Sequence, residues 1–169
     1  MTTPEMKNLT QEEREAVHQE AESRISTFAY RKPEDDPTDT KPKKIIRLQR
    51  SEHLLVAVQV VKEGGENNLH YHTNSDGAWM VLKGRAKFYG VGDKMLGELG
   101  PNEGIVIPGG SRYWFEKAGD EDLEILQIFG YAGKNQKASR VNVERHKDWM
   151  NDEASPQVYD EPAKADASK

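Results

Sequence analysis

The sequence contains no cysteine, so disulfide bonds and thiolate metal ligands are excluded. It also has no run approaching the ~20 consecutive apolar residues that a membrane-spanning helix needs. The N-terminal segment is too polar for a secretory signal. The formal net charge of -5 lacks the basic excess typical of nucleic-acid-binding or membrane-surface proteins. We therefore expect a soluble, cytoplasmic protein that binds neither nucleic acid nor membrane.

The hydrophobic residues are unevenly distributed along the 169-residue chain. They make up only 35% of the whole, but both ends are polar while the middle is rich in aliphatic and aromatic residues. This distribution predicts one ordered domain with two polar extensions. We place an N-terminal helix and arm at 1–44, the domain at 45–132 and a C-terminal extension at 133–169.

The N-terminal extension begins with a helix signal. Thr10 stands at an N-cap position and Glu13 follows three residues later, which is the spacing of a capping box. The helix is expected to end near Arg24. The stretch 32–44 contains three prolines and many charges, so it reads as an extended arm. The C-terminal extension is expected to be partly disordered, chiefly from about Asn151 onward.

Between the extensions, short apolar segments alternate with turn signals such as the glycine pair at 64–65 and the NSDG run at 74–77. Many short strands with this punctuation predict an all-β sandwich or barrel. The expected strands are 45–50, 54–61, 68–72, 78–84, 85–91, 94–99, 104–108, 112–117 and 123–131.

Two histidines stand out in the third expected strand. Because side chains alternate between the faces of a strand, His70 and His72 should point the same way. Two imidazoles on one face are half of a metal site. Alternatively, a pair of this kind performs acid–base chemistry without a metal.

Around this pair the sequence resembles the cupin superfamily. The first cupin motif, G-x5-H-x-H-x3,4-E-x6-G, is matched by Gly64, His70, His72 and Gly84. In the second motif, G-x5-P-x-G-x2-H-x3-N, Pro108 and Gly110 match. The resemblance covers about 45–131 and implies a single double-stranded β-helix, or jelly-roll, barrel with the two histidines facing its interior.

The departures from the family pattern concern the remaining metal ligands. Gly77 stands where the first motif has its glutamate, and Tyr113 stands where the second has its histidine. Asp76 is adjacent, and a one-residue bulge would turn its carboxylate inward. Tyr113 could bind a ferric ion as phenolate, or donate a proton or hydrogen bond to a substrate. We take Tyr113 and Asp76 as candidate catalytic residues.

Four further residues are candidates for contacting a ligand. Trp79 shares a face with position 77 and Phe115 shares one with Tyr113, so both should contribute to an aromatic wall. Gln59 and Gln127 interrupt apolar strands, and a polar side chain there requires a buried partner. Each of these residues could equally be structural.

The main functional hypothesis is an enzyme that acts on a small metabolite, such as an aromatic, carbonyl or hydroxy acid compound. His70 and His72 would hold a divalent Fe, Mn, Ni or Zn ion. The alternatives are metal-free chemistry by the His and Tyr side chains, a non-catalytic sensor, and a mainly structural dimer. Because cupins commonly pair, and the arm at 28–44 could add a strand to a neighbour, we also expect a homodimer.

Overall fold

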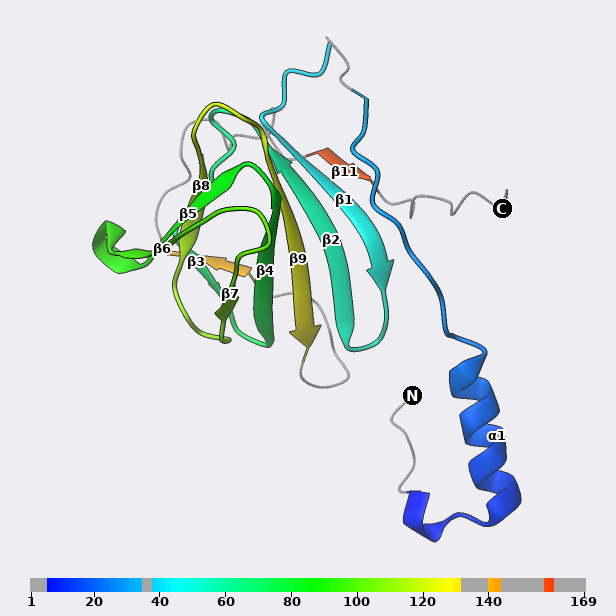
Figure 1. The fold of residues 1–169 in the computed structure, drawn as a ribbon. Helices are drawn as coiled ribbons and strands as arrows, with labels where there is room; N and C mark the ends of the chain where they lie inside the picture. Colours follow the sequence, from blue (N-terminus) through cyan, green and yellow to red (C-terminus); the bar gives the residue numbers. More distant parts are fainter. Residues whose placement is uncertain (1–5, 35–37, 132–139, 144–156, 160–169) are drawn as a thin grey trace.

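The computed structural model describes residues 6–34, 38–131, 140–143 and 157–159 (Figure 1). Strands dominate this part of the chain, with one α-helix near its N-terminus. The elements are η1 (Met6–Asn8), α1 (Gln11–Glu22), β1 (Lys43–Arg50), β2 (Leu54–Val61), β3 (His70–His72), β4 (Ser75–Lys83), β5 (Arg85–Tyr89), η2 (Val91–Asp93), β6 (Met95–Leu99), β7 (Gly104–Ile107), β8 (Trp114–Ala118), β9 (Leu123–Tyr131), β10 (Arg140–Asn142) and β11 (Gln157–Tyr159).

Helix α1 begins as the sequence predicts. The Thr10 side chain accepts a hydrogen bond from the Glu13 backbone N–H, and the Glu13 carboxylate accepts one from the Thr10 N–H at 2.7 Å. This reciprocal capping satisfies two backbone donors that a helix start leaves open. No residue of α1 is buried, and the helix projects away from the barrel (Figure 1). Its start is therefore fixed by local chemistry rather than by packing.

The arm that follows α1 returns to the barrel. Its Tyr30 hydroxyl donates to the Glu124 carboxylate at 2.7 Å, and Lys32 forms an ion pair with Asp122 at 3.3 Å. These contacts hold the arm against strand β9 and the turn before it. The arm covers part of the outer surface of the barrel.

The strands form two facing layers (Figure 1). One is a six-stranded sheet in the order β11-β1-β2-β9-β4-β7. Opposite it lie a three-stranded sheet, β6-β5-β8, and the pair β10-β3. Backbone hydrogen bonds between His70 and Tyr113, at 2.9 and 3.1 Å, link β3 to the segment leading into β8. The described strands thus enclose a single interior.

Two hydrophobic cores lie on the two faces of the six-stranded sheet. The inner core fills the barrel and is rich in aromatic residues, including Trp79, Phe88, Tyr113, Phe115 and Phe129. The outer core is aliphatic and lies partly under Tyr30 of the arm; its buried members are Ile46, Leu48, Val56, Val58 and Val60. A strand buried on both faces has little reason to alternate polar and apolar residues. This explains the nearly unbroken apolar run of β2.

The observed strands match the expected ones with small changes at their ends. The largest error is the turn predicted over 74–77, because β4 already begins at Ser75 and pairs with Tyr131 of β9. The C-terminal extension supplies two further strands, with β10 beside β3 and β11 parallel to β1. The disorder predicted for the rest of that extension lies outside the described residues. No described helix has the length and apolar character needed to cross a membrane.

Candidate functional site

The two histidines of β3 face the barrel interior together, as their spacing predicts. Their ring centroids lie 5.2 Å apart in an edge-to-face arrangement. His70 is buried and His72 is half-buried. Strand β3 is held on one edge by β10, which pairs Arg140 with His72, and on the other by the backbone of Tyr113. The pair is therefore fixed by backbone pairing on both sides.

Both imidazoles are neutral at neutral pH. Burial is the larger cause, and the positive charge of Arg140 is the second; together they lower the pKa of His70 to about 3 and that of His72 to about 4. The Nδ1 of His70 lies 2.7 Å from the Asn68 carbonyl oxygen. Since a carbonyl only accepts, Nδ1 carries the proton and Nε2 keeps its lone pair. The Nδ1 of His72 is buried, and no described residue forms a hydrogen bond with it.

Tyr113 lies beside this pair, with its ring centroid 4.5 Å from that of His70. The residue is 1% exposed, and its hydroxyl has no hydrogen-bond partner in the part of the chain that the structure describes. Burial raises the pKa of Tyr113 well above its usual value, so the phenol keeps its proton at neutral pH. The nearby Trp79 indole N–H partly offsets this increase in pKa, although the two groups do not meet hydrogen-bond geometry.

The aromatic residues predicted to line a ligand wall face the interior and pack against one another. The ring centroid of Trp79 lies 5.0 Å from that of Phe115 and 5.8 Å from that of Phe129. The rings of Phe88 and Phe115 are stacked, with their centroids 5.1 Å apart. The indole N–H of Trp79 is buried and has no hydrogen-bond acceptor among residues 6–34, 38–131, 140–143 and 157–159. Trp79 therefore combines a packing role with an unsatisfied donor close to Tyr113.

The position of the missing glutamate is filled by a phenyl ring. A Cβ atom added at Gly77 would lie 2.5 Å from Cε1 of Phe129. Phe129 pairs with Gly77 across β4 and β9, and its ring centroid lies 4.7 Å from that of His72. An apolar ring thus occupies the space into which an acidic side chain would extend.

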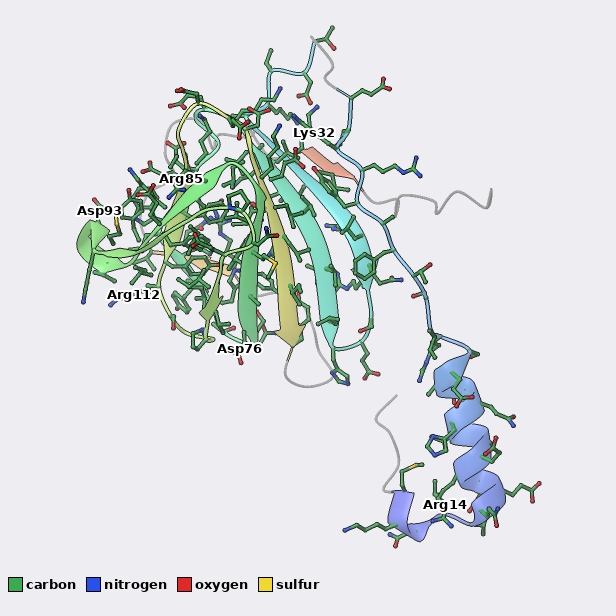
Figure 2. The ribbon with its side chains drawn as sticks, in the orientation of Figure 1. Arg14, Lys32, Asp76, Arg85, Asp93 and Arg112 are labelled. Carbon is green, nitrogen blue, oxygen red and sulfur yellow. The ribbon has the colours of Figure 1, made fainter. Side chains whose placement is uncertain are left out.

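Asp76 does not replace that carboxylate, which corrects the inward turn expected for it. The pairing of β4 with β9 runs without a bulge through Asp76, so its side chain stays on the exposed side. Its Oδ1 accepts a hydrogen bond from the Gly109 N–H at 2.7 Å. Figure 2 shows Asp76 at the end of the barrel, where it lines a rim cleft of about 490 Å³.

The two glutamines expected near the cavity form one buried pair. Gln59 of β2 and Gln127 of β9 lie on the inner face, and the Gln59 amide donates to the Gln127 carbonyl oxygen at 2.7 Å. Within the described part of the chain, the carbonyl oxygen of Gln59 has no hydrogen-bond partner. The pair therefore makes one hydrogen bond between its two amides and leaves one acceptor inside the barrel.

Sequence reasoning missed two cations that influence the site. Arg140 stands directly opposite His72 in strand β10, and its charge acts on His70, His72 and Tyr113. Lys43 is buried, and its charge also acts on His70. Arg140 lies in a polar tail, where its side chain is exposed and its Nε donates a hydrogen bond to Asn142. Lys43 lies at the end of a charged arm, so no local pattern indicated that either charge would act on the site.

The residues present do not fit the metal centre that the sequence resemblance implies. Among residues 6–34, 38–131, 140–143 and 157–159, no three His, Cys, Asp or Glu side chains gather as ligands. The two imidazoles face the positive charges of Arg140 and Lys43, with Phe129 in place of a carboxylate. Metal centres in proteins commonly use at least three protein ligands, whereas this set offers two neutral imidazole nitrogens.

Comparison with known proteins places the barrel in a known family of folds. Residues 57–129 match the family model of the cupin domain. An uncharacterized conserved protein with a double-stranded β-helix domain from Klebsiella pneumoniae is similar over 75% of this chain and 96% of its own, with 19% identity and a TM-score of 0.54. A search of curated proteins found no match to this chain.

Two other solved structures are also similar to this chain. KdgF from Halomonas sp. matches 64% of this chain and 96% of its own length, with 16% identity and a TM-score of 0.52. An oxalate oxidase in complex with the substrate analogue glycolate matches 64% of this chain and 59% of its own, with 19% identity and a TM-score of 0.51. At such identities the likeness establishes the fold, and the predicted double-stranded β-helix is confirmed.

Proposed function

This chain belongs to the cupin superfamily, and we propose that its barrel binds a small carboxylic or hydroxy acid directly through protein side chains. The observation that carries the proposal is a cluster of unsatisfied polar atoms. His72 Nδ1, Trp79 Nε1 and the Tyr113 hydroxyl are all buried, and none has a hydrogen-bond partner among the residues that the structure describes. A buried polar group without a partner costs about 1–3 kcal/mol, so several in one cluster suit a site that a ligand completes.

The charge around this cluster favours an anion. Arg140 lies opposite His72 and lowers the pKa of both histidines through its positive charge. The same positive potential attracts a carboxylate and disfavours a divalent cation. Tyr113 and Trp79 each offer a hydrogen-bond donor to a carboxylate oxygen. The site thus combines a positive potential with neutral donors, which suits an organic acid.

These side chains also supply acid–base chemistry. Tyr113 holds its proton at neutral pH, because burial raises its pKa. A bound carboxylate would raise the pKa of His72 from about 4, because a nearby negative charge favours the imidazolium. His72 would then gain a proton on binding and could return it to the ligand. The site can therefore act as an enzyme or as a sensor.

Calorimetry of the full chain with oxalate, pyruvate, lactate and benzoate tests the proposal. We expect at least one of these acids to bind, and the Tyr113→Phe variant to weaken that binding by about tenfold because a single hydrogen bond to a charged group is lost. Tyr89→Phe is the matched control, because the Tyr89 hydroxyl bonds to Glu116 on the three-stranded sheet. Binding that is absent, or equally strong in Tyr113→Phe, would contradict the proposal.

The competing function is a two-histidine metalloenzyme. One observation favours it: the His70 Nδ1 bond to Asn68 leaves Nε2 with a free lone pair, as in many metal-ligating histidines. The full chain should be supplied with Fe, Mn, Ni and Zn, dialysed and analysed for metal. We expect no stoichiometric ion. A stoichiometric metal that is lost in His70→Ala, and without which no acid binds, would replace our proposal.

The pH dependence of binding separates the same two functions. Since a bound carboxylate raises the pKa of His72, its affinity should increase as the pH falls from 7 to 5. Metal binding should hardly change over that range, because both imidazoles are already neutral. Conversion of the bound acid, followed by NMR, would then distinguish an enzyme from a sensor.

A further inference from the structure

Two neighbouring lysines at the start of β1 point to opposite faces of the six-stranded sheet. Lys43 pairs with Val61, which belongs to the inner core, whereas Lys44 pairs with Val60 of the outer core. Both lysines are buried, with exposed fractions of 3% and 5%. The strand therefore places one amine inside the barrel and the other outside it.

The partners of the two amines differ. Lys44 forms an ion pair with Asp39, with 2.9 Å between Nζ and Oδ2. The Lys43 ammonium donates a hydrogen bond to Oδ1 of the neutral Asn67 side chain, and it lies 5.1 Å from the centroid of the Phe115 ring. No carboxylate forms an ion pair with Lys43 among the described residues. A buried charge held only by an amide and a ring is poorly compensated.

We propose that Lys43 is a reactive interior amine that forms an imine with a small aldehyde or ketone admitted to the barrel. Lys43 lies beside the connection between β2 and β3, where Asn67 is anchored by a backbone hydrogen bond to Phe115 at 3.1 Å. This connection contains Gly64 and Gly65 and has no regular secondary structure. Because Gly65 and Asn67 are themselves buried, we expect a small carbonyl compound to reach the amine by displacing this segment. The inference does not depend on the carboxylate site.

The surroundings of Lys43 favour the neutral amine, which is the nucleophilic form. Burial is the main cause, and the positive charge of Arg140 adds to it; together they lower the pKa of Lys43 to about 7, against a smaller opposing effect of Glu66. His70, from β3, is the other titratable group that interacts with this charge. At pH 7 the neutral fraction of such an amine exceeds that of an ordinary lysine by about a thousandfold.

The chemistry balances without any further reactant. The lone pair of Lys43 Nζ adds to the carbonyl carbon, and a proton passes from nitrogen to oxygen to give a carbinolamine. Loss of water then forms the C=N bond, so one amine and one carbonyl compound give one imine and one water. Hydride from an added reductant converts the imine to a stable secondary amine, which records the site of attack.

The test is reductive alkylation of the native full chain at pH 7 with formaldehyde or glyoxylate and cyanoborohydride, followed by peptide mapping. We expect Lys43 to be modified at least tenfold faster than Lys44 and the exposed lysines. The rate at Lys43 should fall as the pH is lowered from 8 to 6, while the rates at exposed lysines stay low throughout. Modification by both reagents would indicate a general carbonyl site, and by formaldehyde alone a site limited to small neutral carbonyls.

The wild-type chain provides its own internal control, because every lysine is compared in one sample. Lys43→Arg removes the nucleophile but keeps a cation, and it should abolish the early product without changing the labelling of Lys44. Failure of Lys43 to react under native conditions would overturn the proposal. So would reaction of Lys43 only above pH 9, together with the exposed lysines.

Discussion

The two faces of the six-stranded sheet are both buried, but they are built from different residues. The core of the outer face is aliphatic, with members such as Leu48 and Val58. The charged side chains buried on that face are paired, Lys44 with Asp39 and Glu124 with Tyr30. The inner face carries aromatic rings together with Lys43, Gln59 and Gln127. Burying polar groups costs stability unless they are fully paired. Burial of the outer face therefore stabilises the fold. The polar groups buried on the inner face reduce its stability, but they are suited to binding a ligand and to chemistry.

The largest expected effect tests the outer face. Leu48→Ala should lower the free energy of unfolding by about 3 kcal/mol, because a 2%-exposed leucine leaves a cavity when truncated. Acid binding at 25 °C should be unchanged, since Leu48 lies on the opposite side of the sheet from the histidines. Urea unfolding and calorimetry measure the two quantities. A loss of affinity in the folded variant would show that the two faces are not independent.

The next effect concerns the space shared by Gly77 and Phe129. Gly77→Glu should destabilise the protein by about 2 kcal/mol, because its Cβ would lie 2.5 Å from the Phe129 ring and the core would be overpacked. Phe129→Ala should relieve that clash, so a double-mutant cycle measured by urea unfolding should give a favourable coupling free energy.

The same double variant, Gly77→Glu with Phe129→Ala, should also bind Mn or Fe, because it adds a carboxylate beside His70 and His72. Phe129→Ala alone is the control and should bind neither ion.

If the clash between Glu at position 77 and Phe129 were irrelevant, the effects of the two substitutions on the free energy of unfolding would be additive. That result would contradict the interpretation that Phe129 fills the place of the acidic ligand.

A third effect follows from the neutral histidines. The pKa of His70 is about 3 in the folded chain, below its value in the unfolded chain, so its contribution to stability is complete above the unfolded pKa and is lost as the pH falls towards 3. Between pH 7.5 and 5 this amounts to about 2 kcal/mol. His70→Leu should remove that part of the pH dependence of urea unfolding.

The smallest effect on stability concerns the arm outside the outer face. Phe28 is 48% exposed, so Phe28→Asp should change the free energy of unfolding by less than about 0.5 kcal/mol. We propose that the chain forms a homodimer through this arm, and the same variant should then shift the mass measured by light scattering from dimer to monomer. Thr27→Asp is the neighbouring control. A wild-type chain that is monomeric at all concentrations would contradict the proposal.

Much of the fold was predictable because its signals are local. The capping box of Thr10 and Glu13 defines the start of α1 with no help from packing. Alternation along β3 was sufficient to place His70 and His72 on one face. Glycine, proline and aspartate turns separated most of the strands correctly. The exception at 74–77 arose because Ser75 and Gly77 are small residues that pack inside β4, although their types are typical of turns.

The candidate site was predictable only in part, because several of its features depend on which strands pair. Phe129 fills the space beside Gly77 through the register of β4 and β9, which no local pattern reveals. Arg140 reaches His72 because β10 returns to β3, and Lys43 turns inward because β1 begins two residues earlier than expected. The sequence predicted a metal centre with missing ligands. In the structure, Phe129 fills the place of one ligand, and the positive charges of Arg140 and Lys43 act on the site.

The pairing of β11 with β1 has a consequence for how the chain folds. Lys44 and Gln157 are parallel partners although they lie near opposite ends of the sequence. Closing such a distant contact costs chain entropy before it gains stability, so folding should be slow for a chain of this size. During synthesis, the edge of β1 stays uncovered until the segment that forms β11 has left the ribosome. Until then that edge is open to other chains, and the newly made protein is most exposed to misassembly.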